Sequence, residues 1–256
     1  MDAMTAPDAR PSALDALDAS VVVLAGHFGS GKSEIAVNLA LGLRARGEEV
    51  SLVDLDVVKP YFRCRLAKDE LDANGVGLVV PEGDRFWADL PIVVPMVRGA
   101  LRRGPRHGAR VILDIGGDDL GARALGSVGD AIDAARTELL FVVNTRRPFA
   151  EDGAAVAAML RDIEAAARLK VTGLVANSHL MDETTPDVVL EGVAAARELA
   201  ASLGVPLRFA AVLERLIEQE PGLVGRLRCP VLPLRRRLLP PELRRPQFPR
   251  RRPMGI

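Results

Sequence analysis

The sequence predicts a doubly wound α/β domain with a mainly parallel sheet flanked by helices, and two observations lead to this fold class. First, short apolar runs alternate with longer stretches of helical periodicity, a pattern typical of strands joined by crossover helices. Second, only 4% of the residues are aromatic although 48% are hydrophobic, so aliphatic side chains must fill the core, as they do around buried parallel strands. A length of 256 residues suffices for one large domain.

The apolar runs predict the strands, and the periodic stretches between them predict the helices. The predicted strands, in chain order, cover 21–25, 50–55, 77–80, 110–113, 139–143, 171–176, 207–212 and 231–234. The predicted helices cover 33–46, 91–102, 121–136, 150–169 and 186–203. The first helix is expected to end at Gly47, because glycine commonly follows the last residue of a helix.

The two ends of the chain differ in composition from the nucleotide-binding domain predicted at 20–234. The segment 1–19 is acidic and rich in Ala and Pro, and we expect it to be a flexible or loosely helical tail. The segment 235–256 is rich in Arg and Pro, and we expect it to be extended and solvated because proline interrupts helices. A weaker interpretation of 235–256 is a nonspecific contact to RNA or DNA. No apolar run is long enough for a secretory signal or a membrane span.

Composition argues against several functional classes. The 34 Lys and Arg residues balance the 34 Asp and Glu residues, so neither nucleic acid nor a membrane is expected as a partner. The two cysteines, Cys64 and Cys229, form no C-x-x-C pair; zinc and iron–sulfur sites are therefore not expected, and a reducing cytoplasm is. Cys64 stands between Arg63 and Arg65 and is either an activated thiol or, as we favour, a passive small residue.

Residues 26–33 carry the strongest motif, because they match G-x-x-x-x-G-K-[ST] at each fixed position. An apolar run precedes the motif and an amphipathic stretch follows it, so backbone amides and a helix N-terminus would face an anion. Lys32 would contact the β- and γ-phosphates of a nucleotide, and the Ser33 hydroxyl would ligate Mg²⁺. The residues expected to bind the nucleotide are Gly26, His27, Phe28, Gly29, Ser30, Gly31, Lys32 and Ser33.

Acidic residues follow two further predicted strands. Because ligands collect at the carboxyl ends of strands in open α/β sheets, these carboxylates can reach a metal bound at the loop. Asp114 is expected to hold Mg²⁺ through a water, and Asp54 to lie near the metal. Asp56 is expected to orient the attacking water, and Gly117 to offer its amide to the γ-phosphate. Helix capping is the alternative role for any one of these aspartates.

Together, these pieces resemble one class of P-loop NTPases, the SIMIBI class, which includes MinD, ParA, the nitrogenase iron protein and the CobQ/CobB-type domains. The matching elements are the phosphate loop, D-x-D at 54–56, D-x-x-G at 114–117 and a strand ending in Asn177. The resemblance implies that Asn177 contacts adenine and that Asp56 serves hydrolysis. Runs such as GHFGSGKSEIA, DLDVVKPYFR and DIGGDDLGAR more narrowly resemble a bacterial group of MinD-like ATP-binding proteins.

Two departures from the class bear on partners and on the base. MinD and ParA carry a lysine at the second loop position that reaches across a dimer, whereas this chain has His27, so a homodimer stays open. Lys59, Arg63 or Arg65 is a candidate to supply that charge. Relatives that bind GTP use N-K-x-D, whose Asp pairs with guanine; residues 177–180 lack that Asp, which favours ATP.

The expected function is that of a Mg²⁺-dependent ATP-binding protein, a slow ATPase that acts as a nucleotide-dependent switch on a protein partner. The alternative is a ligase or kinase like dethiobiotin synthetase, which spends ATP on a small metabolite. Arg146, Arg147 and residues 82–96 would then hold that metabolite. A solvated turn at the start of a helix is an equally good interpretation of the two arginines.

Overall fold

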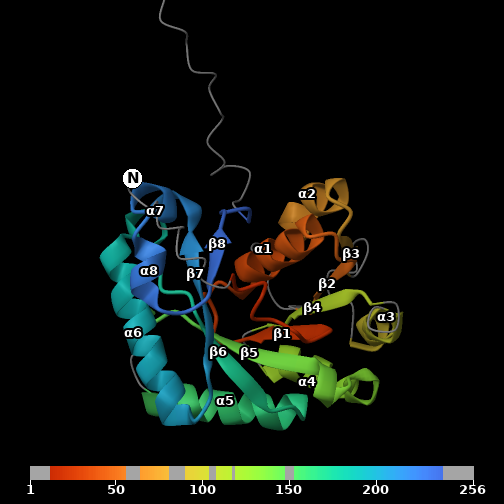
Figure 1. Cartoon of the computed structure of the whole chain (residues 1–256). Helices are drawn as coiled ribbons and strands as arrows, with labels where there is room; N and C mark the ends of the chain where they lie inside the picture. Colours follow the sequence, from red (N-terminus) through yellow and green to blue (C-terminus); the bar gives the residue numbers. More distant parts are fainter. Residues whose placement is uncertain are drawn as a thin grey trace, which may run out of the picture.

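The sheet is built from short aliphatic strands that all run in the same direction. The computed structural model describes residues 12–55, 64–80, 90–103, 108–116, 119–147 and 153–238. Within these residues, eight strands pair in parallel in the order β3-β2-β4-β1-β5-β6-β7-β8 (Figure 1). The predicted α/β fold class is therefore confirmed.

The strands match the predicted apolar runs closely. They are β1 (Val21–Ala25), β2 (Val50–Asp54), β3 (Gly77–Val79), β4 (Arg110–Asp114), β5 (Thr137–Val143), β6 (Val171–Ala176), β7 (Leu207–Leu213) and β8 (Val231–Leu234). The helices are α1 (Lys32–Ala45), α2 (Lys68–Ala73), α3 (Leu90–Arg103), α4 (Asp119–Ser127), α5 (Gly153–Ala167), α6 (Pro186–Leu203), α7 (Glu214–Gln219) and α8 (Leu223–Leu227).

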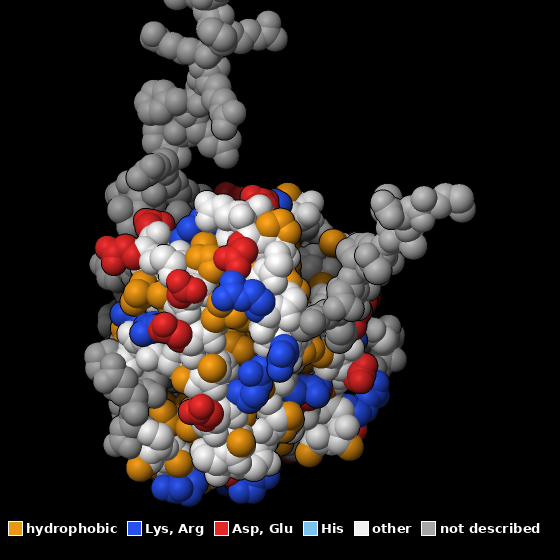
Figure 2. Space-filling model, turned by 60° about the vertical axis from the view of Figure 1, so that its left-hand side comes forward, with side chains coloured by type: hydrophobic (Ala, Val, Ile, Leu, Met, Phe, Trp, Pro, Cys, Tyr) orange, Lys and Arg blue, Asp and Glu red, His pale blue; other side chains and the backbone are white. Residues whose placement is uncertain are grey.

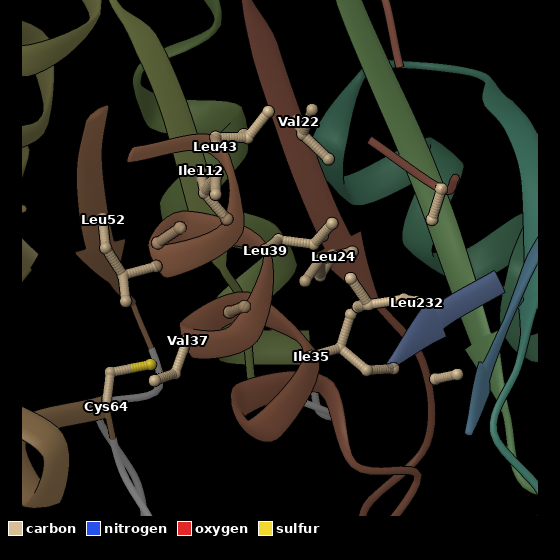
Figure 3. Packing of buried hydrophobic residues seen from close by; sticks show 14 of the residues in the cluster. Val22, Leu24, Ile35, Val37, Leu39, Leu43, Leu52, Cys64, Ile112 and Leu232 are labelled. Carbon is tan, nitrogen blue, oxygen red and sulfur yellow. The ribbon is translucent and has the colours of Figure 1, made fainter. Parts of the chain in front are cut away.

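Helices cover both faces of the sheet, which explains why the strands are apolar on both sides. Figure 1 shows α1 and α2 above the sheet and α4 and α5 below it. Alternate residues of β1 serve the two layers: Leu24 packs with Ile35 and Leu39 of α1, as Figure 3 shows, and Val23 belongs to the core on the opposite face. The second face is completed by residues of α3, α4 and α5.

One predicted helix is wrong in its extent. The stretch 121–136 was expected to be a single helix, but α4 ends at Ser127 and is followed by two short 3₁₀ turns, Gly129–Ala131 and Ala134–Arg136. The side chain of Asp133 accepts a hydrogen bond from the Ala135 amide at 3.0 Å, so a local cap competes with a continuing helix. The helices α2, α7 and α8 were not predicted, because five or six residues are too few to show a helical period.

Parts of both predicted tails pack on the domain. In the segment 1–19, Ala13 and Leu17 are buried, and the Ala13 amide donates to the Val231 carbonyl of β8 at 3.0 Å. At the other end, Leu238 is buried in the core that also contains α1. The N-terminal segment was expected to be flexible or loosely helical and the C-terminal one extended and solvated, whereas Ala13, Leu17 and Leu238 pack on the domain. The remainder of each tail, 1–11 and 239–256, lies outside the described residues.

The strand order places the carboxyl end of β1 between β4 and β5. Ligands bind in such sheets where neighbouring connections leave the strand ends in opposite directions. The loop after β1 and the residues after β2, β4, β5 and β6 therefore meet at one edge. None of the helices in the described part of the chain is long and apolar enough to cross a membrane.

Candidate functional site

The loop 26–33 joins β1 to α1, and its glycines are required by its shape. Gly26 has a φ of +141°, and a Cβ there would lie 2.4 Å from the Val142 carbonyl oxygen. Gly31 has a φ of +91° and precedes α1, whose N-terminus receives no hydrogen bond from a capping side chain. The backbone therefore wraps tightly between β5 and α1, and the positive end of the helix dipole points into the loop.

Lys32 is held inside this loop. Its ammonium donates to the carbonyl oxygens of Gly26 at 3.0 Å and His27 at 3.1 Å, and the residue is buried. The charge is therefore concentrated at the loop rather than spread into solvent. An anion bound by the loop amides would compete with these two carbonyls for the ammonium group.

Asp54 and Asp114 lie side by side at the ends of neighbouring strands. They are register partners in the pairing of β2 with β4, and both are buried. Carboxylate oxygens, together with the Ser33 hydroxyl at the start of α1, are the ligand type that Mg²⁺ prefers, so this set of donors fits that ion. In the described part of the chain, no three His, Cys, Asp or Glu residues gather as a protein-only metal site. Asp56 and Gly117 lie outside the described residues.

Cys64 is a packing residue next to these carboxylates. It is fully buried, lies beside Val37 in Figure 3, and its Sγ donates to Asp114 Oδ2 at 3.4 Å. Burial, followed by the charges of Asp114 and Asp54, raises the pKa of the Cys64 thiol well above its usual value. The interpretation as a passive residue is confirmed.

His27 points into the protein. The residue is only 4% exposed, its Nδ1 lies 3.0 Å from the Phe28 carbonyl oxygen, and its Nε2 accepts a hydrogen bond from the Asn144 amide at 3.4 Å. Burial is the largest cause that lowers the pKa of His27, followed by the charges of Lys32 and Arg147. The His27 ring therefore links the loop to the residue that follows β5, whereas the neighbouring Phe28 is exposed.

Asn144 connects this loop to two strand ends, and the sequence analysis assigned it no role of its own. It is fully buried at the end of β5. Its Oδ1 accepts from the amides of Arg146 at 3.0 Å and His179 at 3.3 Å, and its Nδ2 donates to the His179 carbonyl. Its position after a buried strand was the available signal, since polar residues there face the ligand edge of the sheet.

A pocket of about 390 Å³ opens beside the loop and continues toward the ends of β7 and β8. Asn177 lies at the junction: it is buried and its Nδ2 donates to the Ser30 carbonyl at 2.7 Å. The lining is largely apolar away from the loop, as a nucleoside site requires. The lining residues include Phe28, Gly29, Gly31, Lys32, Ser33, Arg147, Asn177, His179, Met181, Thr184, Val189, Ala211, Leu213, Leu234, Arg236 and Leu238.

The two arginines after β5 separate in the structure. Arg146 forms an ion pair with Glu191 of α6, away from the loop. Arg147 lines the pocket, and a Cβ at Gly29 would lie 3.6 Å from its Nε. The sequence left two interpretations open, in which both arginines bind a ligand or both are solvated. The structure gives the two residues different positions, so neither interpretation holds for the pair.

Comparison with known proteins matches the loop region. The ParA family model described as an NUBPL iron-transfer P-loop NTPase matches residues 16–73, which contain β1, α1 and β2. The chain is 29% identical over 93 residues to the cytosolic Fe-S cluster assembly factor CFD1 of Eremothecium gossypii, covering 36% of this chain and 31% of that one. It is 35% identical over 80 residues to the cytosolic Fe-S cluster assembly factor NUBP2 of Homo sapiens, covering 31% and 27%. The matches thus span less than a third of either relative.

Solved structures share the fold over most of the chain. Chloroplast FtsY from Physcomitrella patens gives a TM-score of 0.53 at 19% identity and covers 87% of this chain and 66% of that one. FtsY from Mycoplasma mycoides gives 0.52 at 17% identity, over 73% and 58%. The predicted resemblance to the ParA class of P-loop NTPases is confirmed over residues 16–73, and the solved structures confirm the fold. The narrower resemblance to a MinD-like bacterial group stays a prediction.

The position of His179 in this chain predicts a loss of stability in mild acid. Burial is the largest cause that lowers the pKa of His179 to about 4, followed by the charges of Arg147 and Arg236. The unfolded chain, in which histidine has its usual pKa of about 6.5, therefore binds a proton more readily than the folded chain. Stability is complete above that value and falls by about 3 kcal/mol as the pH drops toward the folded pKa.

Urea unfolding of wild type and His179→Gln, measured from neutral pH to mild acid, checks the predicted loss of stability. The difference in unfolding free energy between the two proteins is expected to change with pH, because the variant has lost the group that titrates. His27, whose pKa is also lowered, contributes equally to the pH dependence of both proteins, so its effect cancels in the difference. Parallel pH profiles for the two proteins would contradict the partly buried, neutral state of His179.

Proposed function

We propose that this chain binds Mg·ATP, hydrolyses it slowly and acts as a nucleotide-dependent switch on a protein partner in the cytoplasm. The observation that carries the proposal is the arrangement of Lys32 inside a glycine loop, next to two buried carboxylates and an apolar pocket. The loop with Lys32 suits a triphosphate, the carboxylates suit a divalent cation, and the pocket suits a nucleoside.

The proposed roles of the described residues follow their positions, and those of Gly117 and Asp56 follow the sequence motifs. Lys32 and the amides of 26–33 bind the β- and γ-phosphates, and the Gly117 amide adds to the γ-phosphate. Ser33 and Asp114 would hold Mg²⁺, with Asp54 beside it, and the bound ion would neutralise phosphate charge. Asp56 orients the attacking water.

The pocket supports adenine as the base. Recognition of guanine in N-K-x-D proteins relies on a carboxylate that pairs with the base. Among the described residues, Glu34 is the carboxylate that lines the pocket, and its two oxygens accept the amides of Arg237 at 2.6 Å and Leu238 at 3.3 Å. Asn177 offers an amide at the junction of loop and pocket, which suits adenine.

The proposal is confined to nucleotide chemistry and a protein partner. The relatives are named Fe-S cluster assembly factors, and their matched segments contain the phosphate loop. Clusters are bound by cysteine thiolates, whereas Cys64 and Cys229 of this chain are buried in separate cores. Figure 2 shows acidic and basic side chains together on the face it presents, which fits a protein partner better than nucleic acid.

A homodimer of the MinD kind is a less favoured form of the proposal. The second loop position would have to extend outward to reach a partner's nucleotide, and His27 is buried. Arg65 is described and its η1 turn (Cys64–Ala67) lies next to α1, whereas Lys59 and Arg63 lie outside the described residues. Their proposed contribution of charge therefore rests on sequence alone.

Competition binding and turnover test the proposal. ATP is expected to displace a fluorescent ATP analogue from the purified chain at a lower concentration than GTP, and Mg²⁺ is expected to be required. Tighter competition by GTP would overturn the adenine assignment. Phosphate release in a single turnover would support hydrolysis. Its absence would show that the chain binds ATP without hydrolysing it.

The compound that stimulates ATP turnover distinguishes the proposed switch from the alternative, a ligase or kinase that acts on a metabolite. Slow basal turnover that rises with a protein fraction of a cell extract supports the switch. Turnover that occurs only with an added small acid or amine supports the alternative, in which Arg147, on the pocket wall, would hold the metabolite.

A further inference from the structure

Four residues after β8 lie along the start of α1 and form what we call the C-terminal strap, residues 235–238. Asn38 of α1 holds its first residue like a strand partner: Nδ2 donates to the Arg235 carbonyl at 3.0 Å, and Oδ1 accepts the Arg235 amide at 3.1 Å. Asn38 is buried, so these bonds are shielded from water. The strap is thereby fixed to the helix that begins in the phosphate loop.

Glu34 holds the other end of the strap. Its carboxylate accepts the amides of Arg237 and Leu238, and Arg237 also forms an ion pair with Glu70 of α2. Burial raises the pKa of the Glu34 carboxyl, while the two amide bonds favour its charged form. Glu34 directly follows Ser33, so the strap is anchored one residue from the proposed Mg²⁺ ligand.

The strap also forms one wall of the pocket. Leu238 and Arg236 line it together with Leu234 of β8, and its lining also includes Met181, Thr184 and Val189. Arg236 pairs with Asp182 at 2.6 Å, which joins the strap to the 3₁₀ turn Met181–Glu183. The aliphatic part of this space suits the faces of a purine and not a chain of phosphates.

We propose that the C-terminal strap is the wall that binds the nucleoside half of the nucleotide and makes the site selective for nucleotides over bare polyphosphate. The inference rests on the proposed function, since it assumes that the loop binds the phosphates. The loop supplies charge that any polyphosphate can use. The base would contact Arg236 and Leu238 only while the strap is bound to α1 by Asn38 and Glu34.

The test compares two ligands on variants of the full chain. Asn38→Ala removes the hydrogen bonds to Arg235 and Arg237 and one within α1 to the Glu34 carbonyl, and it changes no residue of the loop. The dissociation constant of Mg·ATP is therefore expected to rise about tenfold. Affinity for Mg²⁺ with inorganic tripolyphosphate is expected to stay at the wild-type value. Asn74→Ala is the matched control, because Asn74 is exposed and its side chain bonds only locally, to the Glu70 carbonyl; it should change neither affinity.

Leu238→Ala provides a second variant that does not alter α1. It removes an apolar contact of the strap and is expected to weaken Mg·ATP binding in the same direction, again without an effect on tripolyphosphate. Equal losses for both ligands, or unchanged Mg·ATP affinity in both variants, would overturn the role of the strap. A folded wild-type chain that binds neither ligand would instead contradict the proposed function itself.

Discussion

Replacement of Lys32 by alanine is expected to lower ATP turnover about 100-fold or more and to weaken Mg·ATP binding strongly. The ammonium is a full positive charge inside the loop, and it donates to the carbonyls of Gly26 and His27. In the proposed function this charge needs only to turn from the carbonyls to the phosphates, so its loss removes stabilisation of both the bound ligand and the transition state. Turnover and calorimetry on the purified variant measure both effects.

Lys68→Ala is the matched control for this prediction. Lys68 is exposed and pairs with Asp72 four residues later, so the same chemical change occurs on the surface of α2. Turnover and affinity are expected to stay at the wild-type level, since exposed pairs contribute little. A Lys32→Ala protein that melts like wild type and keeps full turnover would show that the loop does not bind the reacting phosphates.

Gly26→Ala is expected to reduce the free energy of unfolding by about 4 kcal/mol. Two costs combine at this residue. Its φ of +141° is one that alanine rarely adopts, and the added Cβ would lie 2.4 Å from the Val142 carbonyl oxygen. Because that oxygen belongs to the backbone of β5 in the middle of the sheet, the strand cannot yield without disturbing its pairing with β1. Chemical denaturation measures the loss.

Gly47→Ala separates the two costs. Gly47 also has a positive φ, +87°, but among the described residues no neighbouring atom lies within 4 Å of a Cβ built there. Its substitution is therefore expected to cost only about 1 kcal/mol, from backbone strain alone. Equal losses at the two glycines would contradict the close approach of the loop to β5.

Local pattern was sufficient for the sheet and for the phosphate loop. The apolar runs predict each strand within a few residues, because strands buried on both faces leave a continuous signal in the sequence. The loop is equally local: its glycines, Lys32 and Ser33 stand in one octet, and the structure places that octet between β1 and α1. The sequence also places Asp54 and Asp114 at strand ends, where they prove to be register partners.

Contacts between distant residues could not be predicted in the same way. The inward direction of His27 depends on Asn144, which lies 117 residues further along the chain. The strap shows the same difficulty, since it belongs to the segment 235–256, whose Arg- and Pro-rich composition indicates a solvated segment. Its anchors, Asn38 and Glu34, lie 197 and 203 residues away from the amides that they bind, so no local window contains both partners.

A crystal structure of the full chain with Mg²⁺ and a nonhydrolysable ATP analogue tests the central claim most directly. The account predicts that the β- and γ-phosphates lie against the amides of 26–33, that Lys32 Nζ turns from the two loop carbonyls to the phosphates, and that the base enters the pocket between Asn177 and the strap. An analogue bound elsewhere, with Lys32 still on the carbonyls of Gly26 and His27, would contradict it.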